Sequence, residues 1–217
     1  VEKELANYEF VEKKQEEKRF HLENALEGGV VTRFLPEPNG PAHIGHAKAA
    51  WLSKDAARQY GGKCFLRFDD TNPEKESGEY VEALREDLSW LGLEFDGESF
   101  SSDLMPEFYK YAAALVASGD AYVCSCSKEE IAEKREKKKA CACRAKLVEE
   151  NQAEWQEFVG GGVGECEAVL RLKADLNSEN TVMRDPTLFR IIETPHYRQK
   201  DKYVAWPTYD FEVSIAD

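Results

Sequence analysis

The stretch that decides the fold is VVTRFLPEPNGPAHIGHAKAAWLSKDAARQYGGKCFLRFDDTNP, residues 30–73. Its first six residues are β-branched and apolar enough for a buried strand, and the Pro- and Gly-rich run 36–41 then forces a loop. Residues 44–60 have a helical pattern that stops at a Gly-Gly pair, and residues 63–68 predict a second strand. This order of strand, loop, helix and strand is typical of a βαβ unit in a parallel sheet.

The pattern changes past residue 100. A helix over 78–91 completes the first unit, and the capping box Ser127-x-x-Glu130 opens a highly charged helix in the second half. The other expected elements are helices over 106–118 and 147–158 and strands over 168–172, 188–192 and 203–206. The sequence therefore predicts an α/β protein with the first half of a parallel sheet followed by a separate α+β module.

The composition excludes several classes of protein. Of the 217 residues, 42% are hydrophobic and 33% are charged, which allows a core and argues against general disorder. The longest apolar run, residues 111–117, is too short for a membrane span, and no secretory signal opens the chain. The formal net charge of −13 argues against wholesale nucleic-acid binding, although it leaves room for a local basic patch. These features predict a soluble, cytoplasmic protein.

Two histidines stand at the predicted start of the helix, in His43-Ile44-Gly45-His46. At positions i and i+3 they share one helix face, beside the unpaired N–H groups and the positive dipole end that bind polyphosphates. Gly45 removes a side chain that would keep a phosphate or a planar base away from the backbone. The spacing alone leaves metal ligation, phosphate contact and no function equally open. The position at the carboxyl edge of a parallel sheet favours ligand binding.

Four of the six cysteines form two close pairs: Cys124, Cys126, Cys141 and Cys143. In a chain of intracellular character, such pairs favour a metal over a disulfide framework. Four thiolates suit a tetrahedral, structural zinc site, because no position remains for water. The alternative is four unrelated cysteines. His196 is a spare ligand candidate, remote in the sequence from both pairs.

Residues 32–48 resemble the first signature of class I aminoacyl-tRNA synthetases, in the glutamyl/glutaminyl subgroup. LRFDDTNPE, residues 66–74, matches the second strand and turn of that subgroup. MRDPTLFR, residues 183–190, and WPTYDF, residues 206–211, match two later stretches. The cysteine pairs, and the lack of a His soon after the last stretch, make the chain most similar to the archaeal- and eukaryotic-type glutamyl enzymes.

The resemblance implies a two-step ligase reaction that uses glutamate, ATP with Mg²⁺ and glutamate tRNA, tRNA(Glu). The α-carboxylate of glutamate attacks the α-phosphate of ATP, and the resulting glutamyl-adenylate passes its glutamyl group to the tRNA 3′ end. Such a reaction depends on positioning and charge stabilisation more than on a covalent nucleophile.

The resemblance also assigns roles to residues of this chain. Catalysis falls to His43 and His46. ATP binding falls to Pro36, His43, Gly45 and His46. Binding of the amino-acid substrate is assigned to Arg33, Glu37, Asp69 and Tyr209. Arg33 is suited to hold the side-chain carboxylate of glutamate as a bidentate fork, whereas without the motif it reads as an ordinary arginine at a strand edge. A structural Zn²⁺ falls to the four paired cysteines.

The resemblance divides the chain into a charged N-terminal arm (1–26), the first half of a Rossmann-type catalytic domain (27–100), an inserted acceptor-binding module with the zinc site (101–200) and a return to the catalytic domain (201–217). The lysine-rich second signature and the anticodon-binding region do not appear, so we expect a piece of a longer enzyme. The arm is a candidate contact for other synthetases or translation factors. The basic run 134–139 reads as a solvated helix face, with contact to acceptor-stem phosphates as the alternative.

Three alternatives stay open. A glutaminyl-tRNA synthetase is the nearest, and charging assays with each amino acid separate the two. A tRNA-modifying glutamyl-queuosine synthetase fits less well, because its first signature usually has a bacterial character. A non-catalytic, synthetase-like protein that binds tRNA or a partner is opposed by intact His43, His46 and Arg33.

Overall fold

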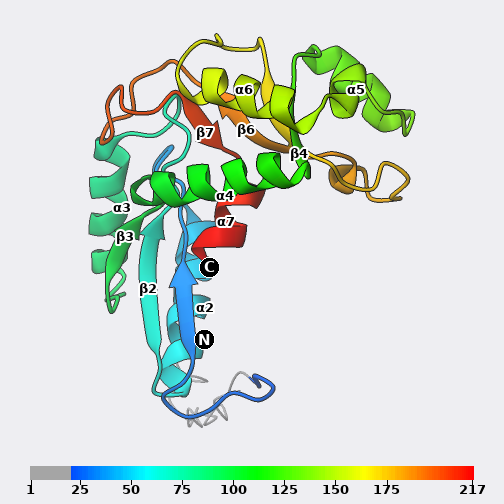
Figure 1. Cartoon of the computed structure of the whole chain (residues 1–217). Coiled ribbons are helices and arrows are strands. Elements are labelled where there is room, and N and C mark those ends of the chain that lie inside the picture. Colours follow the sequence, from blue (N-terminus) through cyan, green and yellow to red (C-terminus); the bar gives the residue numbers. More distant parts are fainter. Residues whose placement is uncertain (1–20) are drawn as a thin grey trace, which may run out of the picture.

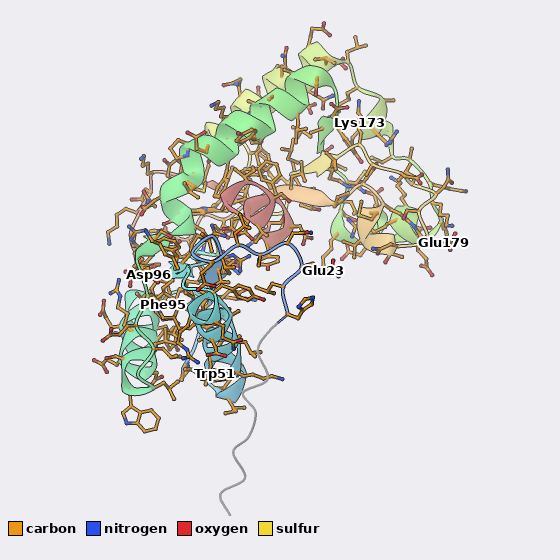
Figure 2. The ribbon with its side chains drawn as sticks, turned by 90° about the horizontal axis from the view of Figure 1, so that it is seen from below. Glu23, Trp51, Phe95, Asp96, Lys173 and Glu179 are labelled. Carbon is orange, nitrogen blue, oxygen red and sulfur yellow. The ribbon has the colours of Figure 1, made fainter. Side chains whose placement is uncertain are left out.

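The computed structural model describes residues 21–217, which fold around two β-sheets (Figure 1). The first sheet is parallel, in the order β1-β2-β3, and the second is antiparallel, in the order β4-β5-β6-β7. In Figure 2, Trp51, Phe95 and Asp96 lie around the first sheet, whereas Lys173 and Glu179 lie around the second. The predicted α/β class is confirmed. Of the predicted arm, residues 1–20 lie outside the described part of the chain, and residues 21–26 contain a turn.

The first sheet has the predicted order of elements. They are β1 (Val31–Phe34), α2 (Ile44–Gln59), β2 (Lys63–Phe68), α3 (Gly78–Trp90) and β3 (Glu98–Phe100). Val31 pairs with Lys63 in parallel register, so the carboxyl ends of β1 and β2 lie at one edge. Gly62 is required between α2 and β2, because a Cβ atom there would lie 1.9 Å from the carbonyl oxygen of Val30. The short strand β3 was not predicted.

The second sheet is built from the predicted α+β module. Its elements are α4 (Met105–Ser118), β4 (Ala121–Cys124), α5 (Lys128–Glu136), α6 (Val148–Val159), β5 (Val169–Leu172), β6 (Thr187–Ile191) and β7 (Ala205–Pro207), with short 3-10 turns η1 (Ser101–Leu104), η2 (Ala142–Ala145) and η3 (Thr181–Met183). Phe108, Trp155 and Phe189 join α4, α6 and β6 in one buried cluster. The capping box at Ser127 forms as predicted.

The chain ends in a helix, α7 (Tyr209–Ala216), which was not predicted. β7 still pairs with β6, so residues 205–207 belong to the second sheet, and α7 then approaches the first. Arg67 on β2 donates hydrogen bonds to the carbonyl of Ala216 and to the carboxylate of Asp217. Ser101 Oγ donates to buried Glu212 on α7, at 2.5 Å. The last helix therefore ties the end of the described chain to the first sheet. The functional division into arm, half-domain, inserted module and return stays a prediction.

Candidate functional site

The predicted binding residues gather where β1 and β2 end. These ends point toward α7 and the second sheet (Figure 1). Arg33 stands near the end of β1, and Asp69 directly follows β2. The backbone N–H of Asp69 donates to the carbonyl of Pro36 at 3.0 Å, which joins the loops that follow the two strands. Ligands bind at this edge in open parallel sheets.

The histidine pair caps the N-terminus of α2. His43 is the N-cap residue and its Nδ1 accepts from the N–H of Gly45 at 3.0 Å, while Nδ1 of His46 accepts from the N–H of His43 at 3.2 Å. Because each Nδ1 accepts a hydrogen bond, the ring proton of each histidine lies on Nε2. The rings stack with centroids 4.0 Å apart, and burial, with a smaller effect of His43, lowers the pKa of His46. The pair therefore presents two Nε2–H donors at a helix N-terminus.

Gly45 is needed for this cap. A Cβ atom at this position would lie 2.7 Å from Cε1 of His43, which is closer than side chains tolerate. No acidic residue occupies the first turn of α2, so the positive end of the helix faces no side-chain carboxylate of its own. Both features suit a bound phosphate.

Arg33 already holds a carboxylate. Its Nε donates to Oδ1 of Asp217 at 2.7 Å and its Nη2 donates to Oδ2, so a side chain of this protein occupies a bidentate fork of the kind predicted for the glutamate carboxylate. These hydrogen bonds raise the pKa of Arg33, and Tyr209 adds a smaller electrostatic effect. Tyr209 is the first residue of α7 and is half exposed. Within residues 21–217, Nη1 of Arg33 has no hydrogen-bond acceptor, so one edge of the guanidinium is open.

Asp69 and Glu37 belong to an acidic group in the loops that follow β2 and β1. Asp69 is 3% exposed, and burial raises its pKa although Thr71 Oγ1 donates to it at 3.0 Å. Glu37 is exposed and accepts from the side chain of Asn39 at 2.6 Å. A buried carboxylate at this place can bind the ammonium group of an amino acid.

Two neighbours of this acidic group, the acid Glu76 and the cation Arg190, were not predicted from the sequence. Glu76 is buried and accepts from the N–H of Asn72 at 2.8 Å, and burial raises its pKa to about 9. Arg190, from β6 of the second sheet, lies close enough to Glu76 and Asp69 for their charges to raise its pKa, although burial lowers it overall. The motif 183–190 contained Arg190, but only the fold brings it to the first sheet.

A buried network joins the two sheets behind Asp69. Asp70 accepts hydrogen bonds from Ser102 N–H and Oγ, both at 2.8 Å, and from the hydroxyl of Tyr197 at 3.0 Å. Nε2 of His196 lies 3.0 Å from the Asp70 carbonyl, and Nδ1 accepts from two backbone N–H groups, so His196 donates to Asp70. We call these four residues the Asp70 latch. Burial raises the pKa of Asp70 to about 6 and lowers that of His196 to about 4.

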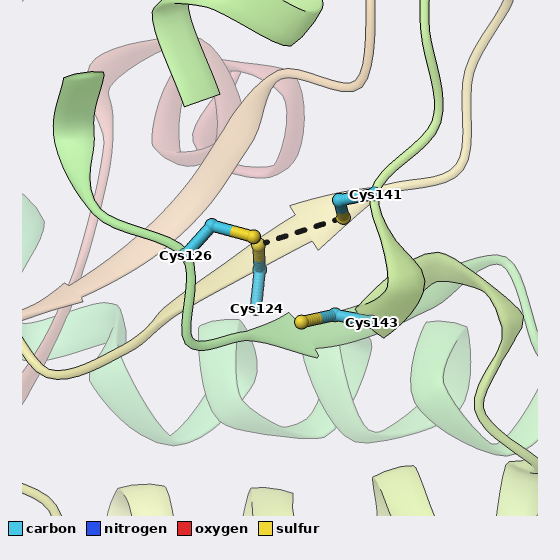
Figure 3. A group of neighbouring side chains, drawn as sticks. All are labelled: Cys124, Cys126, Cys141 and Cys143. Atoms are coloured by element: carbon cyan, nitrogen blue, oxygen red, sulfur yellow. Dashed lines mark hydrogen bonds between the residues drawn. The ribbon is translucent and has the colours of Figure 1, made fainter. Parts of the chain in front are cut away.

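The four paired cysteines converge, as Figure 3 shows. Cys124 and Cys126 come from the end of β4, and Cys141 and Cys143 from the start of η2. Their sulfur atoms all lie within 4.8 Å of one another, and the sulfurs of Cys124 and Cys141 are 3.8 Å apart. Four sulfurs about 2.3 Å from a tetrahedral zinc are about 3.8 Å apart, so the group can hold a structural zinc. His196 is outside the group, because it belongs to the Asp70 latch, and its role as a spare ligand is wrong.

A cavity of about 830 Å³ lies between the loop after β2 and the cysteine group. It extends from Glu74, in the loop after β2, past Arg190 on β6 to Arg135 on α5 and Cys126. Lys137 and Lys139 of the basic run are exposed, whereas Lys134, Arg135 and Lys138 are partly buried, so only part of the run is the solvated face that the sequence favoured. Among residues 21–217, no helix has the length and apolar character needed to cross a membrane.

Comparison with known proteins identifies relatives. The family described as "tRNA synthetases class I (E and Q), catalytic domain" matches residues 29–217. The chain is 47% identical over 200 residues to a glutamate–tRNA ligase of Nitrosopumilus maritimus, covering 90% of this chain and 34% of the relative. It is 45% identical over 210 residues to the same enzyme of Thermococcus onnurineus, covering 95% and 37%. A glutamine–tRNA ligase of Vibrio parahaemolyticus is 47% identical over 193 residues, covering 87% and 35%.

The fold also has a solved counterpart. The glutamate-tRNA synthetase of Elizabethkingia anophelis superposes with a TM-score of 0.60 at 23% identity, over 87% of this chain and 42% of that one. This likeness concerns the fold. The chain spans about a third of the length of the curated relatives it matches.

Proposed function

This chain belongs to the family of class I glutamate and glutamine tRNA synthetase catalytic domains, and we propose on that basis that it is the N-terminal part of a glutamate–tRNA ligase. The observation that carries the proposal is the Arg33 fork. It holds a carboxylate at the carboxyl edge of a parallel sheet, and buried Asp69, which suits an ammonium group, directly follows the neighbouring strand at the same edge. Glutamate carries both groups.

Arg33 reads the side-chain carboxylate of glutamate. Its open Nη1 edge donates to the substrate, while Asp217 fixes the plane of the guanidinium. Asp69 binds the α-ammonium group, and Glu37 and Tyr209 line the same pocket. A planar guanidinium distinguishes the side-chain carboxylate of glutamate from the carboxamide of glutamine. Both oxygens of a carboxylate accept hydrogen bonds from it, whereas the NH₂ group of a carboxamide would face an N–H donor.

The histidine pair binds the phosphates of ATP. The Nε2–H groups of His43 and His46 and the free N–H groups of α2 donate to phosphate oxygens, Gly45 lets the phosphates approach the backbone, and Pro36 lines the ATP site. Mg²⁺ accompanies ATP and neutralises part of its charge. These donors stabilise the charge that develops when the bond between the α-phosphorus and the pyrophosphate breaks.

The reaction then has two steps. An α-carboxylate oxygen of glutamate bonds to the α-phosphorus, and pyrophosphate leaves. A ribose hydroxyl at the tRNA 3′ end next attacks the carbonyl carbon of the adenylate, and AMP leaves. The cavity lined by Arg135 and Arg190 reaches Glu74, in the loop after β2, which supports entry of the tRNA end from the second sheet. This role in translation places the protein in the cytoplasm, and association with other synthetases or translation factors through residues 1–26 stays a prediction.

The proposal is tested with the full-length enzyme that contains this chain. Its charging of tRNA(Glu) and tRNA(Gln) is measured with glutamate and with glutamine. We expect glutamate to be transferred to tRNA(Glu). Transfer of glutamine alone would favour the glutaminyl enzyme, which the relative from Vibrio parahaemolyticus keeps as the second candidate. Absence of ATP binding would favour the non-catalytic alternative.

A further inference from the structure

The cysteine group poses a charge problem. Three of its four cysteines are buried. Four thiolates around Zn²⁺ carry a net charge of −2, and a buried, unpaired charge is strongly unfavourable. The site therefore needs positive partners that are close to the sulfur atoms and held in place.

Two cations contact the sulfurs from different elements. Nη1 of Arg171, on β5, lies 3.9 Å from the sulfur of Cys124 and 4.0 Å from that of Cys141. Nζ of Lys134, on α5, lies 3.5 Å from the sulfur of Cys126. The fourth sulfur, of Cys143, faces the neutral hydroxyl of Ser125 at 3.7 Å. Two positive charges in contact with sulfur atoms thus stand against the net charge of −2 of the zinc-bound group, and the charge of Lys146 also favours the thiolate of Cys143.

We propose that Arg171 and Lys134 are the charge partners of the zinc tetrathiolate and that they set how firmly the metal is retained. They are positioning residues and do not bind the metal. The proposal rests on zinc binding by the four cysteines and is independent of the ligase reaction.

Arg171 is fixed for this role. It is 3% exposed, its Nε donates to the carbonyl of Asp185 at 3.0 Å, and its guanidinium lies over the ring of Tyr122, 5.6 Å from the centroid. Asp185 is fixed in turn, because its carboxylate accepts from Arg144 at 2.8 Å and from the hydroxyl of Tyr122 at 3.0 Å. Asp185 has a φ of 47°, in the left-handed region that few residues other than glycine adopt, and the surrounding hydrogen bonds maintain this conformation. These contacts leave the Nη1 edge of Arg171 directed at two sulfurs.

Lys134 is the more exposed partner. Its side chain is 32% exposed, and the carboxylate of Glu130 lies 3.9 Å away. Solvent screens its charge more than that of Arg171, so it contributes less. Lys137 is a matched control, because it follows Lys134 by three residues in the basic run, is exposed, and pairs with Glu133.

The test measures zinc loss from the full 217-residue chain, loaded with zinc, after addition of excess chelator. Changes next to metal ligands typically cost about 10–100-fold in metal affinity. We expect Lys134→Met to weaken zinc retention at the lower end of that range, about tenfold, and Arg171→Met at the upper end, about 100-fold. Zinc retention by Lys137→Met should stay within about twofold of the parent. Lys134→Arg should retain zinc better than Lys134→Met does, because it keeps the charge.

Circular dichroism of each zinc-loaded variant checks the fold. If Arg171→Met fails to fold, the comparison of zinc loss from Lys134→Met and Lys137→Met still tests the proposal. Equal zinc loss from these two variants would overturn the proposal. A parent chain without zinc would also overturn it, whereas the charging of tRNA with glutamate would remain a separate question.

Discussion

Replacing Glu76 by Gln should stabilise the protein at neutral pH. Glu76 is buried beside Asp69 and Asp70, and its carboxyl group accepts one N–H, from Asn72 at 2.8 Å. Burial, reinforced by the neighbouring carboxylates, raises its pKa from 4.5 to about 9. Gln has nearly the same shape as Glu and keeps an oxygen that accepts from the Asn72 N–H. Because Gln does not ionise, folding no longer requires a buried carboxyl group to take up a proton.

The sign and size follow from linkage between protonation and folding. The folded carboxyl keeps its proton up to about pH 9, whereas the unfolded one loses it above about pH 4.5. Stability from this group is therefore complete below about pH 4.5 and falls as the pH rises to about 9. At about 1.4 kcal/mol per pKa unit, the cost is about 3 kcal/mol at pH 7 and below about 1 kcal/mol at pH 5. Because burial of the amide offsets part of the gain, we expect Glu76→Gln to add about 1–3 kcal/mol at pH 7.

Urea unfolding of the parent and the variant, followed by circular dichroism between pH 5 and pH 8, measures this effect. Glu74→Gln, an exposed neighbour, is the control and should change the free energy of unfolding by less than about 0.5 kcal/mol at every pH. A Glu76→Gln variant that is destabilised at pH 7, or whose gain does not grow with pH, would refute the reasoning.

Three further predictions concern the latch, the zinc and the fork. Asp70→Ala should lower the free energy of unfolding in urea by about 2–4 kcal/mol, because Ser102 and Tyr197 lose their buried acceptor; a loss under about 1 kcal/mol would show that the latch contributes little. A zinc chelator should make the four paired cysteines reactive in a thiol-alkylation experiment read by mass spectrometry, while Cys64 in the first sheet stays protected; equal labelling with and without chelator would contradict a metal. Arg33→Lys should reduce kcat/KM for glutamate in the full-length enzyme by an amount on the order of 2–4 kcal/mol, since lysine lacks the planar fork; unchanged charging kinetics would remove Arg33 from the site.

The elements that the sequence predicted are those with local causes. The strand-loop-helix-strand order from β1 to β2 rests on β-branched residues, prolines and a Gly-Gly stop within one stretch, and each element formed within about one residue of its expected bounds. The four cysteines were found because two short pairs limit the possible geometry. The histidine cap follows from the same local logic, since all its partners lie within three residues.

The parts that were missed depend on distant contacts. β3 has three residues, too few for a periodic pattern, and exists because it pairs with β2. α7 is stabilised at its end by Arg67, about 150 residues earlier in the chain. His196 reaches Asp70 across 126 residues, and Arg190 approaches Asp69 from the other sheet. No local pattern encodes such pairs, because the fold alone brings them together.

Glutamate-dependent exchange of pyrophosphate into ATP, by the full-length enzyme with tRNA present, examines the proposed site itself. We expect exchange with glutamate, little with glutamine, and a fall of about 10²–10³ in His46→Ala, because one preorganised phosphate donor is lost. Exchange that requires glutamine instead of glutamate, or that proceeds at the parent rate in His46→Ala, would contradict the assignment of these residues to glutamate activation.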